Sequence, residues 1–113
     1  MRFFMRTLLF MVAALLVLSP LTAQAVTQLR VTNQAQFEAR VELYDRQYAR
    51  TSGHWQLAPG ASRLIQDVPG DVVRFYWYQG STRLCGISRA IPRAAIVTAY
   101  YDKATAKCRI EVQ

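Results

Sequence analysis

The sequence contains few of the side chains that most often carry enzyme chemistry. It has one histidine, His54, and two cysteines among 113 residues. Nucleophilic catalysis needs a nucleophile, a base and an orienting group, and no serine lies in a Gly-x-Ser-x-Gly elbow. Glu38 and Glu42 would lie on one face of a strand about 13 Å apart, too far to share a proton. We therefore expect no enzyme, and a small hydrolase that uses His54 is the least favoured alternative.

Patterns for metals, cofactors and nucleic acids are also missing. One histidine and two distant cysteines do not make a tetrahedral zinc site. The acidic residues are scattered, and the spacing of an EF-hand loop does not occur. Basic residues are spread along the chain and belong to no recognised nucleic-acid module. The sequence therefore predicts no metal site, no cofactor and no nucleic-acid partner.

Only one long apolar run is present, and it lies at the N-terminus. Two arginines precede the almost purely apolar residues 7–18, and a Ser-Pro pair and an Ala-Gln-Ala site follow. This order predicts a cleavable secretory signal peptide at residues 1–25, cut between Ala25 and Val26. An uncleaved anchor is the alternative, but the run is shorter than the about 20 residues that span a bilayer. No second apolar run occurs, so no membrane span is expected after cleavage.

The two cysteines fit an exported protein. Cleavage would leave residues 26–113 as one domain and, without the leader's two arginines, lower the formal net charge from +7 to +5. An even number of cysteines in a small exported chain predicts a disulfide, here Cys85 with Cys108. The bridge would stabilise the fold by about 3 kcal/mol. These features together predict a periplasmic or secreted location.

The rest of the chain has the patterns of β-strands. Apolar and polar side chains alternate over residues 37–44 and again over residues 28–32, as in half-buried strands. Residues 71–78 (DVVRFYWY) are mostly β-branched and aromatic, which is typical of a central strand. Residues 45–53 are polar and are expected to form a loop. Short strands separated by turns predict an all-β fold, namely a small antiparallel, immunoglobulin-like β-sandwich of about seven strands with one disulfide.

The central strand offers a candidate binding face. Its alternation would direct Val73, Phe75 and Trp77 into the core. The side chains on its other face are Arg74, Tyr76 and Tyr78. Tyrosine and arginine are enriched in the residues that contribute most to protein interfaces. The face is therefore a candidate partner-binding surface, and the alternative is that a loop or a neighbouring strand covers it.

The polar loop provides a second candidate, since arginine and tyrosine alternate there as Arg46, Tyr48 and Arg50. Loops often carry binding residues, although a solvated connection between strands is the alternative. Taken together, the sequence predicts an exported, non-enzymatic binding protein of the bacterial envelope. The expected partner is another protein. The alternative ligand is an anionic glycan or the head groups of lipids at the envelope surface.

Overall fold

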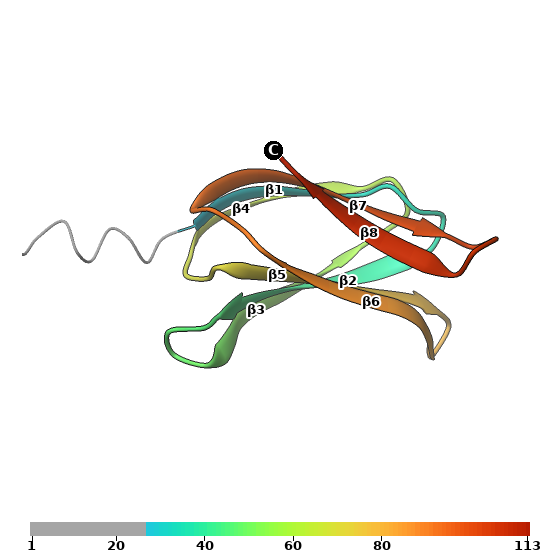
Figure 1. Cartoon of the computed structure of the whole chain (residues 1–113), viewed down its shortest axis with the longest axis horizontal. Coiled ribbons are helices and arrows are strands. Elements are labelled where there is room, and N and C mark those ends of the chain that lie inside the picture. Colours follow the sequence, from blue (N-terminus) through green and yellow to red (C-terminus); the bar gives the residue numbers. More distant parts are fainter. Residues whose placement is uncertain (1–26) are drawn as a thin grey trace, which may run out of the picture.

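The computed structural model describes residues 27–113, which form eight β-strands in two facing sheets (Figure 1). The strands are β1 (Thr27–Asn33), β2 (Glu38–Asp45), β3 (Arg50–Leu57), β4 (Ser62–Val68), β5 (Val72–Gln79), β6 (Thr82–Ala90), β7 (Ala94–Asp102) and β8 (Lys107–Val112). This confirms the predicted β-sandwich, with eight strands where about seven were expected. The predicted signal peptide and its cleavage site, Ala25–Val26, lie outside the described residues.

The two sheets contain four strands each. One has the order β4-β1-β7-β8 and the other the order β3-β2-β5-β6. Every neighbouring pair is antiparallel except β1 and β7, which run parallel. The β1–β4 pair and the β2-β5-β6 group resemble strands B–E and C-F-G of an immunoglobulin domain. The described residues include no helix long and apolar enough to cross a membrane.

The core lies between the sheets and follows from the period of two in each strand. Residues of β2 and β5 that face each other across the ladder, such as Val41 with Phe75 and Ala39 with Trp77, are all fully buried. The other buried apolar side chains include Leu29, Val31, Leu43, Leu57, Ile65, Val73, Val97, Ala99 and Ile110. The prediction that Val73, Phe75 and Trp77 face the core is therefore confirmed.

One buried polar side chain, Asn33, connects three parts of the fold. Its Oδ1 accepts hydrogen bonds from the Trp77 indole N–H at 2.9 Å and from the Ala35 N–H at 3.2 Å. Its Nδ2 donates to the carbonyls of Phe37 at 2.8 Å and Leu57 at 3.2 Å. Buried polar groups are stable when such partners satisfy them. Asn33 therefore fixes the loop after β1 and the end of β3 against the centre of β5.

The predicted loop at residues 45–53 is wrong in its extent. β2 continues to Asp45, a four-residue turn follows, and β3 already begins at Arg50. Ala49 in this turn has a φ of 50°. The polar residues 50–53 form a strand because pairing with β2 satisfies their backbone groups. Their side chains remain partly or fully exposed because β3 lies at the edge of its sheet.

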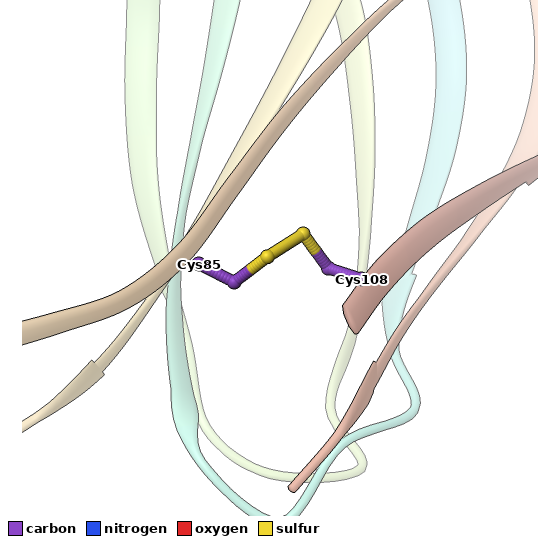
Figure 2. The surroundings of a disulfide bond; sticks show 2 residues. All are labelled: Cys85 and Cys108. Carbon is purple, nitrogen blue, oxygen red and sulfur yellow. A yellow bond between two sulfur atoms is a disulfide. The ribbon is translucent and has the colours of Figure 1, made fainter. Parts of the chain in front are cut away.

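The predicted disulfide is present and joins the two sheets (Figure 2). Cys85 lies on β6 and Cys108 on β8, with their Cα atoms 6.3 Å apart. Each strand is the edge of its own sheet, so the bridge closes one side of the sandwich. Arg89 adds a second link there, because its Nη1 donates to the carbonyl of Ile110 at 2.6 Å. A disulfide of this kind indicates an oxidising compartment.

Candidate binding face

The outward side chains of β2, β5 and β6 form one continuous surface, which we call the tyrosine-arginine face. It consists of Glu38, Arg40, Glu42, Tyr44, Arg74, Tyr76, Tyr78 and Arg83. The antiparallel register sets these side chains in rows, since Glu42 lies opposite Arg74 and Arg40 opposite Tyr76. Side chains directly opposite each other on a sheet lie close enough to interact. The face is thus a product of the register as well as of the local alternation.

Two arginines of this face lie over tyrosine rings. The Cζ atom of Arg74 is 4.1 Å from the centroid of the Tyr44 ring, and that of Arg83 is 4.3 Å from the Tyr76 centroid. A guanidinium over an aromatic face is attracted by the ring quadrupole, with about 0.5–1 kcal/mol at exposed sites. The stacking also restricts the rotamers of both side chains. The stacking therefore favours these positions of Arg74 and Arg83 on the sheet before any partner binds.

The position of Arg83 depends on a glycine. Gly86 lies opposite Tyr76 in the β5–β6 ladder. A β-carbon at position 86 would collide with Nη2 of Arg83 and come within 2.8 Å of Cδ1 of Tyr76. Because glycine has no β-carbon, the guanidinium occupies the space above the β6 backbone. A substitution at Gly86 would therefore displace Arg83 without changing the charge or the aromatic content of the face.

The arginines of the face differ in their ionic partners. Arg40 Nε donates to Glu42 Oε2 at 3.0 Å and forms an ion pair. Arg74 and Arg83 make no side-chain hydrogen bond or ion pair within residues 27–113. A guanidinium carries five N–H donors in a planar fork that matches a carboxylate. These two arginines therefore keep their donors free for a ligand.

No loop or strand covers the tyrosine-arginine face in the described part of the chain. In Figure 1 the outer side of the β3-β2-β5-β6 sheet faces away from the other sheet, and no element crosses it. Arg74, Tyr76 and Tyr78 are half-buried rather than exposed. The structure thus places these three predicted residues outward on an open sheet.

The second group of candidate residues, Arg46, Tyr48 and Arg50, lies at the β2–β3 hairpin. It does not form one site with Arg74 and Tyr76. The backbone N–H of Arg46 donates to Asp71 Oδ1 at 3.0 Å, and its Nε donates to Oδ2 at 2.7 Å. The backbone hydrogen bond is the main cause that lowers the pKa of Asp71, and the Arg46 side chain adds to it. Arg46 is therefore bound to Asp71 within the fold. Tyr48, by contrast, is 61% exposed, and the guanidinium of Arg50 lies near its ring.

The sequence analysis did not identify Tyr44 and Gly86 as parts of the site. Their roles, and the place of Arg83 beside Tyr76, depend on the pairing of β2, β5 and β6, which the sequence pattern alone does not contain. His54 is exposed, lies opposite Glu42, and makes no side-chain hydrogen bond within the described residues. Residues 27–113 contain no group of three metal-ligating side chains.

Comparison with known proteins adds no functional information. The sequence matches no protein-family model and no curated protein. The functional argument therefore rests on the geometry of the tyrosine-arginine face.

Proposed function

We propose that this chain is a non-enzymatic binding protein that binds another protein through the tyrosine-arginine face. The observation that supports this proposal is the stacking of Arg74 on Tyr44 and of Arg83 on Tyr76, with no ionic partner for either guanidinium group among residues 27–113. Fixed aromatic and arginine side chains lose little conformational entropy on binding. Tyrosine and arginine are also the residue types that most often dominate the energy of protein interfaces.

The shape of the surface favours a protein over a small molecule as the main partner. The face spans three neighbouring strands of an open sheet, with alternating aromatic and charged rows. Protein interfaces of ordinary size cover about 800 Å² on each partner. A partly apolar, uncovered sheet face provides a suitable centre for a contact of that size, and the surrounding charged side chains form a polar rim.

The proposed location is the periplasm or the secreted fraction of a bacterium. The disulfide between Cys85 and Cys108 supports an oxidising compartment, where such bridges form and persist. The predicted signal peptide at residues 1–25 would direct the chain to such a compartment. The partner is therefore expected among the proteins of the bacterial envelope.

Capture of partners from envelope extract tests the proposal. The oxidised protein, produced from the full chain, is immobilised beside the double variant Tyr76→Ala/Arg83→Ala. The matched control is Tyr100→Ala/Arg109→Ala, which removes a similar stacked pair, at 4.3 Å, from the outer face of the other sheet. We expect the captured protein to disappear with the first variant and to remain with the control, at unchanged melting temperatures. Equal capture by all three proteins would contradict the proposal.

A second candidate function is binding of anionic glycans or lipid head groups at the envelope surface. The free donors of Arg74 and Arg83 favour it, because planar guanidinium groups also pair with sulfate, phosphate and carboxylate. Exposed charges are screened beyond about 8 Å at physiological ionic strength. This function predicts retention on heparin or on vesicles of anionic lipid that falls steeply with added salt. Retention that is unchanged in high salt would exclude it.

A further inference from the structure

A small hollow lies at one end of the tyrosine-arginine face, where Tyr78 lies opposite Arg83 in the β5–β6 ladder. It has a volume of about 350 Å³ and is lined by Glu38, Arg40, Gln56, Tyr78 and Gly80. These residues come from β2, β3, β5 and the turn after β5. The register brings them together, since Glu38 lies opposite Tyr78, and Arg40 lies opposite Gln56. Small-molecule sites range from about 300 to 1,000 Å³, so the hollow has the size of a small ligand site.

Tyr78 differs from the other tyrosines of this face. The rings of Tyr44 and Tyr76 each carry a guanidinium, whereas no cation lies over the ring of Tyr78 within residues 27–113. Tyr78 is half-buried and forms one wall of the hollow. The ring of Tyr78 is therefore not covered by a guanidinium, and part of the side chain is accessible from the hollow.

The polar side chains around the Tyr78 ring are of three kinds. Glu38 offers a carboxylate and Gln56 an amide, and neither side chain has a hydrogen bond or an ion pair among the described residues. Arg40 donates from its Nε to Glu42, so its two terminal nitrogens can donate to a ligand. At Gly80 an added β-carbon would meet nothing within 4 Å, so this side of the hollow is open. The hollow thus combines an uncovered ring with free donors and acceptors.

We propose that this hollow binds one unit of an uncharged saccharide chain. The C–H face of a sugar ring can lie on Tyr78, because aromatic rings favour apolar and weakly positive C–H groups on their faces. Planar carboxylate, amide and guanidinium groups can each form two hydrogen bonds, which matches pairs of adjacent hydroxyls. Glu38 and Arg40 bring one charge of each sign to the lining, so the site favours neither an anion nor a cation. A fully apolar ligand would leave the polar side chains of the lining without partners.

This site goes beyond the proposed protein-binding function and does not depend on it. Arg74 and Arg83 do not line the hollow, and Tyr78 does not take part in their stacking. Different variants test the two proposals, so one can fail while the other holds.

Titration by heteronuclear NMR tests the saccharide site. The oxidised protein, produced from the full chain, is titrated separately with cellotetraose, maltotetraose and N-acetylchitotetraose. For at least one of the three we expect shifts of the amides of Glu38, Arg40, Gln56 and Tyr78, with a dissociation constant on the order of 1 mM because the hollow is shallow. Tyr78→Ala should weaken binding by about tenfold or more, and Tyr78→Phe by less than about threefold, since the ring remains.

Two further variants keep the test decisive. Gln56→Ala changes an exposed side chain on an edge strand, so this variant should fold even if Tyr78→Ala does not. It should weaken saccharide binding by about threefold or more, because the amide that lines the hollow is lost. Arg109→Ala, on the outer face of the other sheet, should leave saccharide binding unchanged. The proposal is overturned if none of the three saccharides shifts these amides at about 20 mM. It is also overturned if the shifts lie elsewhere, or if choline, a cation that also fits an aromatic ring beside a carboxylate, binds while the saccharides do not.

Discussion

The indole N–H of Trp77 donates to the side-chain oxygen of Asn33 over 2.9 Å, in the interior between the two sheets. Both residues are fully buried, and 44 positions of sequence separate them. A buried N–H that loses its acceptor costs about 1–3 kcal/mol. Trp77 is the largest buried side chain of the core. Its orientation therefore depends on one amide at the end of β1.

Replacing Asn33 by alanine should lower the free energy of unfolding by about 3 kcal/mol, since it leaves several buried groups unsatisfied. Urea unfolding followed by circular dichroism measures the change. The Trp77 indole proton should also move in the NMR spectrum because its hydrogen bond is lost. Gln36→Ala, an exposed position in the loop after β1, is the control and should change stability by less than about 0.5 kcal/mol. An Asn33→Ala variant as stable as this control would contradict the prediction.

Replacing both cysteines by serine should lower the free energy of unfolding by about 3 kcal/mol, because the closed loop between Cys85 and Cys108 has a sequence separation of 23. Hydrogen exchange of the β8 amides should become faster, since β8 loses its covalent connection to β6. Exchange in the β1–β4 pair, which is remote from the bridge, should change less. Equal protection of β8 in the oxidised protein and in the double variant would show that pairing with β7 and the Arg89–Ile110 hydrogen bond hold this edge without the disulfide.

The pKa of Asp71 should lie below its ordinary value of 3.8 in the folded protein, mainly because the backbone N–H of Arg46 donates to its carboxylate. A lowered folded-state pKa stabilises the fold above the ordinary value, and this stabilisation is lost as the pH falls through the folded pKa. The Asp71 side chain is 39% exposed, so the contribution should be below about 1 kcal/mol. Asp71→Asn should therefore lower stability slightly at pH 7 and not at all in strong acid.

NMR titration of the Asp71 carboxyl carbon gives the decisive measurement. Arg46→Ala should return the pKa only part of the way toward its ordinary value, because the backbone hydrogen bond survives the substitution. A midpoint at or above 3.8 in the unmodified protein would show that burial, which raises the pKa, outweighs the hydrogen bonds.

Gly70→Ala should destabilise the fold by about 1–3 kcal/mol through overpacking. A β-carbon at this position would collide with Cγ of Leu43 and come within 2.9 Å of its Cδ1, and Leu43 is fully buried. Chemical unfolding of a double-mutant cycle tests the cause. In a Leu43→Ala background the same glycine substitution should cost much less, because the colliding atoms are gone. If the effects of the two substitutions on the free energy of unfolding are additive, the destabilisation by Gly70→Ala comes from the backbone at position 70 and not from the collision with Leu43.

Local patterns predicted the strands and the direction of their side chains. The alternation in residues 72–78 directs Phe75 and Trp77 inward and Arg74 and Tyr76 outward, because neighbouring side chains of a strand point to opposite faces. The pairing of Cys85 with Cys108 was predictable because the chain has no other cysteine. Residues 45–53 were less predictable, because their polar composition does not show that β2 provides a pairing partner.

The composition of the candidate site could be predicted only in part. Arg74, Tyr76 and Tyr78 were expected on one face, and the structure places them there. The stacking of Arg74 on Tyr44 could not be predicted, nor the placement of Gln56 and Tyr78 around one hollow, because these arrangements join strands that are distant in the sequence. Arg46, expected as a binding residue, instead donates to Asp71 across a separation of 25 residues.

The sequence by itself thus determined the β class, the outward face of β5 and the disulfide, because period-two alternation and a single cysteine pair depend on no register. Only the tertiary structure decided which side chains meet. It stacked Arg83 on Tyr76 above Gly86, left the ring of Tyr78 uncovered, and placed Asn33 against Trp77. The physical reason is that strand order and register set these neighbours, and both arise from the packing of the whole sandwich.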